Sequence, residues 1–303
     1  MQINRKKQKS AKTIMRPVFD LYRKLRYESF LWRLGVKKEE LLILATITKT
    51  GTHYMRFLFA NYLKQLDNSS NNPAGPFDID DMFPNGWHLA YLGGRPYKKP
   101  TPLLNLLGLH DMPRSHIDYQ EAYWKNSRVL HLYRNPLDYA VFLYIFKYQY
   151  YKDLAGTVSG PVEVLNKHFE DYIKMYLSYC VAAKANSNTK LLSISYEDLS
   201  RQPQVCLRTI IRWLGFEPDP YKVDLAVQYS SEQVTSLIGA GERWQRDNTV
   251  PANPSVIEEF INTCINEGSI GQWKKYFNSS DVRLVQDKLN RFGVDLYDFV
   301  LEP

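Results

Sequence analysis

The chain has 303 residues, of which 44% are apolar and 14% aromatic, so it is long enough to bury a large core. Its formal net charge of +7 favours an anionic partner such as a nucleotide. The cysteines, Cys180, Cys206 and Cys264, are too scattered for a disulfide framework or a zinc site, so we predict no metal and a reducing, cytoplasmic location. We find no apolar run of about 18 residues and no secretory signal pattern, and therefore expect no transmembrane segment.

Residues 1–40 are predicted to form a basic arm followed by an amphipathic helix that packs on the main domain. Apolar residues recur at helical spacing over residues 13–34. Most helices of this kind pack on their own domain, and contact with a membrane is the alternative. Basic side chains outnumber Asp20, the single acid of residues 1–26: Arg5, Lys6, Lys7, Lys9, Lys12, Arg16, Arg23, Lys24 and Arg26. The case for nucleic-acid binding depends mainly on this arm, and we predict no nucleic-acid partner.

Residues 41–303 are predicted to form one α/β domain. Residues 41–47 are a short apolar run that suits a strand buried on both faces, and Thr52 opens a helical pattern that ends near residue 66. Residues 67–100 read as a long loop. Two further strands and several helices are expected at 128–133 and 191–195, and at 136 onwards, 161–186, 196–238 and 281–292. Strands that alternate with helices predict a central parallel sheet flanked by helices.

The strongest chemical signal is Lys49-Thr50-Gly51-Thr52, between the first strand and its helix. Backbone N–H groups at the positive end of a helix attract phosphate, and Gly51 lets the backbone approach closely. Thr50 and Thr52 offer hydroxyl donors, and Lys49 offers a mobile positive charge. An ATP- or GTP-binding Walker A loop places its lysine after the last glycine, whereas here the lysine comes first. The alternative is a capped helix that binds no phosphate.

This segment resembles the 5′-phosphosulfate loop of cytosolic-type sulfotransferases that use 3′-phosphoadenosine-5′-phosphosulfate (PAPS). That family reads approximately P-K-[ST]-G-[TS]-[TS]-W after its first strand, and residues 49–52 match it. His53 and Tyr54 replace the family's hydroxyl residue and tryptophan. The resemblance implies that this loop holds the 5′-phosphate and that Tyr54 contacts adenine.

Two later segments resemble the same family in the same order. Residues 131–141, HLYRNPLDYAV, resemble its R-N-P-x-D segment, in which the arginine binds the 3′-phosphate. Arg134 matches, whereas Phe142 stands at the position of the family's serine. The alternative for Arg134 is a salt bridge with Asp138 at the start of a helix. Tyr196 begins a Y-E-D-L segment whose tyrosine reaches the nucleotide in the family.

Two more segments complete the nucleotide site that the resemblance implies. Thr235 and Leu237 belong to a segment resembling the family's adenine-binding T-S-F. Gly268 begins a stretch resembling the family's G-x-x-G-x-W-K lid, without the basic pair that precedes it there. Other cations must then bind the 3′-phosphate, and Arg243 and Arg246 are predicted to do so. The resemblance therefore covers about residues 41–277 and implies transfer of a sulfuryl group, in which Lys49 neutralises the leaving phosphate, with no metal.

The base that deprotonates the acceptor belongs to a His-x-Pro segment in that family. Counting back from Pro113, Asp111 takes the histidine position and His110 lies one residue earlier. An imidazole with an ordinary pKa near 6.5 suits proton removal at neutral pH, so we favour His110, with Asp111 as the alternative or as its partner. His116 and His53 are the further candidates.

The acceptor is expected to be a small molecule. Asp78, Asp80 and Asp81 lie among aromatic residues in the long loop, a combination that suits a cation such as a guanidinium-bearing natural product. The alternative is a solvated acidic turn. Aromatic residues after Pro136 are expected to line the acceptor pocket, with core packing as the alternative: Phe142, Tyr144 and Tyr148. A non-catalytic nucleotide-binding module and a P-loop kinase-like phosphotransferase remain alternative functions.

Overall fold

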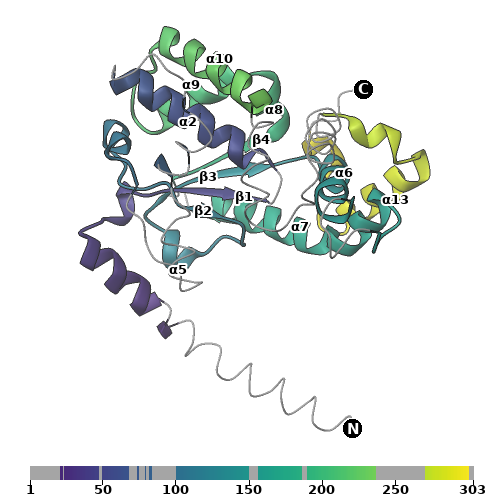
Figure 1. Cartoon of the computed structure of the whole chain (residues 1–303). Coiled ribbons are helices and arrows are strands. Elements are labelled where there is room, and N and C mark those ends of the chain that lie inside the picture. The colour runs from purple at the N-terminus through teal and green to yellow at the C-terminus, as the bar shows by residue number, and fades with distance from the viewer. Residues whose placement is uncertain are drawn as a thin grey trace.

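A four-stranded parallel sheet lies at the centre of the molecule (Figure 1). The structure is a computed structural model, and it describes residues 21–22, 24–47, 50–67, 74, 79, 82–83, 100–149, 156–185, 190–236 and 270–299. The strand order is β2-β1-β3-β4, and every neighbouring pair is parallel. The strands are β1 (Leu42–Thr46), β2 (Arg114–Ser115), β3 (Arg128–Tyr133) and β4 (Leu191–Ser195).

Helices cover both faces of this sheet, which explains the continuous apolar run of β1. Leu42 and Leu44 belong to one core cluster, and Ile43 and Ala45 belong to the other. The first cluster packs under α2 (Thr52–Asp67), α9 (Pro203–Trp213) and α10 (Pro220–Ser236). The second packs against α6 (Pro136–Leu143), α7 (Pro161–Ala185) and α13 (Ser279–Asn290). Short helices also occur in the described chain: α5 (Glu121–Trp124), α8 (Tyr196–Arg201), η1 (Lys38–Glu40), η2 (Pro102–Leu107), η5 (Gln272–Lys275) and η6 (Leu296–Phe299).

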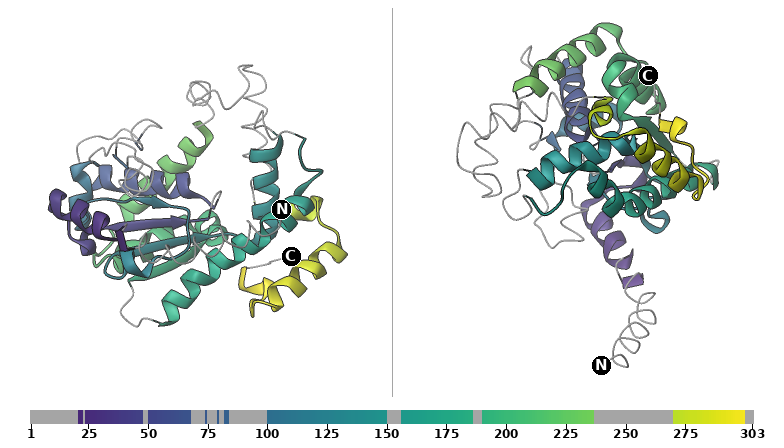
Figure 2. Two further views of the ribbon diagram at one scale, coloured as in Figure 1. Left: turned by 90° about the horizontal axis from the view of Figure 1, so that it is seen from below. Right: turned by 90° about the vertical axis from the view of Figure 1, so that its right-hand side faces the viewer.

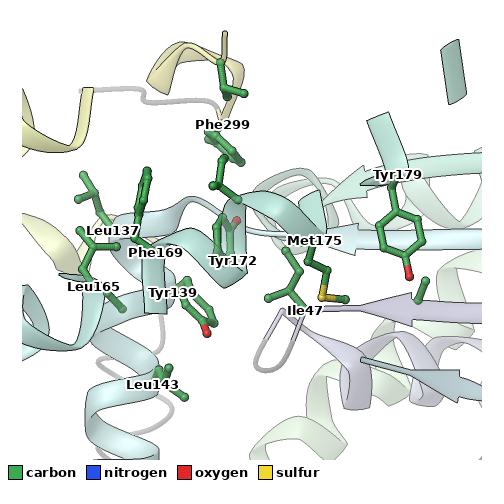
Figure 3. Packing of buried hydrophobic residues seen from close by; sticks show 14 of the residues in the cluster. Ile47, Leu137, Tyr139, Leu143, Leu165, Phe169, Tyr172, Met175, Tyr179 and Phe299 are labelled. Carbon is green, nitrogen blue, oxygen red and sulfur yellow. The ribbon is translucent and has the colours of Figure 1, made fainter. Parts of the chain in front are cut away.

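One face of α7 joins the sheet to the carboxyl-terminal elements (Figure 3). Its buried residues recur at intervals of three to four, so they lie on one side of the helix. Tyr172 packs against Tyr139 of α6, with ring centroids 4.6 Å apart, and against Phe299 at 6.4 Å. The hydroxyl of Tyr172 also donates to the backbone oxygen of Arg134. These contacts fix the start of α6 relative to the sheet.

The α/β fold with a parallel sheet is confirmed, and the strands expected at 128–133 and 191–195 have those bounds. β2 was not predicted, because it is two residues long and neither of them is apolar. The helix after Pro136 changes at Leu143 into a π-helical turn over Tyr144–Gln149. Of the helix expected over residues 13–34, the described part is helical at 21–22 and 24–34. No helix in the described part of the chain is long and apolar enough to cross a membrane.

Candidate functional site

The described part of the junction between β1 and α2 consists of Ile47, Thr50 and Gly51. Gly51 has a φ of +87°, a conformation that favours glycine. A Cβ atom there would lie 2.6 Å from Cδ2 of Tyr196, so only glycine lets the turn pack on that ring. The first turn of α2 presents backbone N–H groups that no helical carbonyl accepts. This junction is therefore shaped to receive a phosphate group.

The threonine hydroxyls of this junction bond within the protein. Thr50 is fully buried, and its hydroxyl donates to the backbone oxygen of Ile47 at 2.7 Å. The hydroxyl of Thr52 donates to Oγ1 of Thr46 at 2.8 Å. Both threonines therefore hold the shape of the turn, and its backbone N–H groups are the donors that suit a ligand.

His116 lies beside this turn, directly after β2. Its Nδ1 is 2.7 Å from the backbone oxygen of Thr46 and 2.9 Å from Oγ1 of the same residue. The ring is exposed, although Thr46 itself is buried. Because a carbonyl oxygen only accepts, Nδ1 must carry the proton in this contact, and the lone pair of the neutral ring is then on Nε2. The position of His116 follows from the register of β2, which pairs Ser115 with Ala45.

His110 and Asp111 lie at the opposite end of the same sheet. Asp111 forms a bridge with Leu41, before β1 begins, and the backbone N–H of His110 donates to the oxygen of Glu40 at 2.7 Å. Parallel strands rise about 3.3 Å per residue, so the level of Leu41 is roughly 16 Å from that of Thr46. The structure therefore does not bring either of the two favoured bases to the phosphate-binding turn.

The junction between β3 and α6 contains a buried arginine. Only 1% of Arg134 is exposed, and its guanidinium carbon lies 4.4 Å from the ring centroid of Tyr196 and 5.4 Å from that of Phe142. Tyr196 thus packs on both junctions, since its other neighbour is Gly51. Arg134 therefore places its positive charge against two aromatic rings, one of which is Phe142, the residue at the position of the family's serine.

Two buried carboxylates belong to the same junction. Asp138 accepts hydrogen bonds from the backbone N–H groups of Gly271, at 2.8 Å, and Trp273, at 3.1 Å, so it ties the described part of the predicted lid to α6. Glu197 accepts from the N–H of Asn135 at 3.0 Å. Burial raises the pKa of Asp138, against the lowering effect of Arg134. Burial likewise raises the pKa of Glu197 from 4.5 to about 7. Sequence reasoning missed Glu197, because nothing in the Y-E-D-L segment signals that its glutamate is buried.

The aromatic residues predicted to line the acceptor pocket have different surroundings. Phe142 and Tyr144 are half-buried. Tyr148 is 2% exposed, and its hydroxyl lies 2.7 Å from Nε2 of His168. Tyr148 is therefore packed in the core, which was the alternative to lining the acceptor pocket.

The remaining predicted site residues divide into those with a described position and those without. Tyr54 and exposed His53 lie in the first turn of α2, and burial raises the pKa of Tyr54. Thr235 lies in α10. The others lie outside the described residues: Lys49, Asp78, Asp80, Asp81, Leu237, Arg243, Arg246 and Gly268. Within the described residues no cluster of His, Cys, Asp or Glu side chains could hold a metal ion.

Comparisons with known proteins show the family and agree with the α/β fold. The Sulfotransferase domain family matches residues 39–291. The 3-alpha-hydroxysteroid sulfotransferase of Cavia porcellus is 23% identical over 275 residues, which are 86% of this chain and 88% of that protein. Cytosolic sulfotransferase 12 of Arabidopsis thaliana is 26% identical, over 85% of this chain and 79% of that protein. Retinol dehydratase in complex with androsterone and the inactive cofactor PAP has a similar fold, with a TM-score of 0.56 and 17% identity over 87% of this chain and 82% of that one.

The fold and the two strand-to-helix junctions define an α/β protein whose strands end, at their carboxyl ends, in helix starts of the kind that suit phosphate groups. The family match covers most of the chain and includes both junctions, so the chain belongs to the Sulfotransferase domain family. Membership confirms the predicted enzyme class, a sulfotransferase that takes its sulfuryl group from PAPS and passes it to a small acceptor.

Proposed function

We propose that His116 is the base that takes the proton from the acceptor's hydroxyl group during sulfuryl transfer. One observation carries this assignment: Nδ1 of His116 is 2.7 Å from the backbone oxygen of Thr46, at the end of β1 beside the phosphate-binding turn. This contact makes Nε2 the proton acceptor of the neutral ring and fixes the ring's orientation. A general base has to lie near the reacting group before its pKa matters, and this favours His116 over His110.

The junction between β1 and α2 suits the 5′ end of the donor, which supplies the sulfuryl group. The turn at Gly51 and the N–H groups at the start of α2 would hold the 5′-phosphate, and we keep Lys49 as the residue that neutralises charge on the leaving phosphate. Arg134 would contribute to the potential that attracts the 3′-phosphate. Tyr196, which packs on both Gly51 and Arg134, would set the distance between the two phosphate sites.

For the acceptor we propose an uncharged alcohol. Support comes from relatives whose names specify hydroxysteroids and from a fold neighbour in complex with androsterone or retinol. The cationic acceptor rested on Asp78, Asp80 and Asp81, which lie outside the described residues, and the comparisons offer no support for a guanidinium-bearing compound. The cytoplasmic location stays a prediction.

The base is tested by single-turnover sulfation with saturating PAPS, using His116→Ala and the matched control His110→Ala. General-base catalysis contributes about 10²- to 10⁴-fold, so His116→Ala should lose at least a hundredfold in rate while its binding of 3′,5′-bisphosphoadenosine is unchanged. His110→Ala should remain close to the wild type. A near-normal rate for His116→Ala, with a large loss for His110→Ala, would return the role to His110.

The acceptor class is tested by comparing kcat/KM for androsterone with that for a guanidinium-bearing alcohol of similar size. We expect androsterone to be the better substrate. A preference for the cationic alcohol that disappears in Asp78→Asn or Asp80→Asn would instead support the cationic site.

A further inference from the structure

The helix of residues 24–34 has exposed apolar side chains on one face. Leu25 is 58% exposed and Trp32 is 82% exposed, and Leu21, one turn before Leu25, is 58% exposed. Spacings of four and seven residues place these three side chains in one line along a helix. Tyr22, 60% exposed, lies beside the same line. A tryptophan that is four-fifths exposed lacks most of the stabilising free energy that burial of its ring would supply. Burial of this face against a partner would therefore be favourable.

The opposite face of this helix is anchored to the protein. Tyr27 and Leu31 are buried, and the ring of Tyr27 meets that of Tyr123 edge to face, with centroids 5.2 Å apart. At the border of the apolar line, Glu28 forms an ion pair with Lys38 at 3.3 Å that ties the helix to η1. In Figures 1 and 2 the helix (purple) lies at the edge of the molecule, and its amino-terminal end points away from the sheet. The apolar line is therefore held in a fixed position on the outside of the protein.

Positive charge accompanies this apolar line. Arg26 and Arg33 are exposed, and at 100° per residue they lie next to the direction of Tyr22. The sequence before residue 27 contains nine basic residues and the single acid Asp20, so the whole amino-terminal segment is strongly cationic. Glu28 borders the other side of the line and is paired with Lys38. A line of Leu and Trp with arginines along one side is a pattern of helices that lie in the plane of a membrane surface.

We propose that this helix docks the enzyme on an anionic lipid bilayer, with Leu21, Leu25 and Trp32 entering the interface and Arg26 and Arg33 binding lipid headgroups. Charge complementarity identifies the occupant, because anionic lipids attract basic side chains next to an apolar face. Nucleic acid would use the charge and leave the apolar line in water. This surface is separate from the strand ends that carry the sulfuryl-transfer site, so the proposal does not depend on the acceptor or on His116.

The test is co-sedimentation of the full chain with vesicles of phosphatidylcholine alone or mixed with phosphatidylserine. We expect binding to the mixed vesicles that weakens as salt is added. Each basic residue near an anionic surface contributes roughly fivefold, so the double variant Arg26→Gln/Arg33→Gln should bind about 25-fold more weakly. Trp32→Ser should bind at least about tenfold more weakly, because it removes the largest apolar side chain of the line.

Matched controls distinguish binding through this face from nonspecific binding to vesicles. Tyr221→Ala removes a ring that is 70% exposed on α10, and Lys184→Gln/Lys190→Gln removes two exposed charges elsewhere. Both controls should bind vesicles like the wild type, and every variant should keep wild-type sulfation of a water-soluble acceptor. Leu21→Ser/Leu25→Ser repeats the test should Trp32→Ser prove unstable.

Three results would overturn the proposal. The first is the absence of binding to phosphatidylserine vesicles at low salt. The second is binding that Trp32→Ser and Leu21→Ser/Leu25→Ser leave unchanged, as expected of a nucleic-acid surface. The third is a dimer in sedimentation that Trp32→Ser abolishes and vesicles do not dissociate, which would make this face an interface between two copies of the chain.

Discussion

The two strand-to-helix junctions of the site lie at the same edge of the sheet but differ in charge. The described part of the junction after β1 consists of uncharged residues, chiefly threonines and Gly51. Its backbone N–H groups are the donors that suit a ligand. The junction after β3 contains Arg134, with Asp138 and Glu197 buried nearby. Tyr196 packs between them.

The difference shows that two neighbouring strand ends of one sheet can be built either from backbone conformation or from buried charge. The described part of the first junction depends on the conformation of Gly51, between Thr50 and Thr52. The second is assembled from three distant segments, since Asp138 binds the turn at Gly271 and Glu197 binds the backbone of Asn135. Buried charges need partner charges and hydrogen bonds. At the second junction these come from several segments of the chain. We therefore expect charge changes to act mainly at the second junction and backbone changes at the first.

The largest effect is expected from Arg134→Met, which removes the cation beside two buried carboxylates. Breaking a buried charge pair costs about 3–5 kcal/mol, and the loss should be measured as the free energy of unfolding in urea at neutral pH. The cost should shrink as pH falls, because the carboxylates then take up protons. Arg128→Met is the control, since that side chain is only half-buried at the start of β3. Equal costs for the two variants would refute the charge argument.

A somewhat smaller effect is expected from Gly51→Ala. The φ of +87° strains any L-residue, and the new methyl group would lie 2.6 Å from the ring of Tyr196, so we expect about 2–4 kcal/mol of destabilisation. Stabilisation by 3′,5′-bisphosphoadenosine should also be lost. The control is Gly215→Ala, where φ is +97° but no atom lies within 4 Å of the added Cβ. That variant should lose about 1–2 kcal/mol and keep ligand binding.

The smallest effect is expected from Glu197→Gln, and it should depend on pH. Burial raises the pKa of Glu197 from 4.5 to about 7, so the folded protein keeps a proton that the unfolded chain releases between these values. The wild type therefore loses stability as pH rises from about 4.5 to 7. Glutamine keeps an acceptor for the N–H of Asn135 and has no proton to lose. The variant should gain about 1–3 kcal/mol on the wild type between pH 5 and 8.

The free energy of unfolding, measured by thermal or urea denaturation at pH 5 and at pH 8, gives this gain. Glu217→Gln, in an exposed ion pair with Arg212, is the control and should show no such gain. A difference between Glu197→Gln and the wild type that is constant with pH would contradict the assignment.

The sequence by itself determined the class of fold and the first junction. Apolar runs at 41–47 and 128–133 and the pattern Thr50-Gly51-Thr52 are local, and local patterns survive without knowledge of the rest of the chain. The family match to residues 39–291 agrees with that reading.

Only the tertiary structure decided which histidine lies near the turn and how Arg134 is compensated. The chemistry of imidazole favoured His110, although counting from Pro113 placed Asp111 at the family's histidine position. The parallel pairing of β2 with β1 instead places His116 at the carboxyl end of the strands and His110 at the amino end. The register of two strands is a relation between distant segments, and one polar dipeptide carries too little pattern to reveal it. The same reason hid Glu197, whose burial depends on β3 and α6.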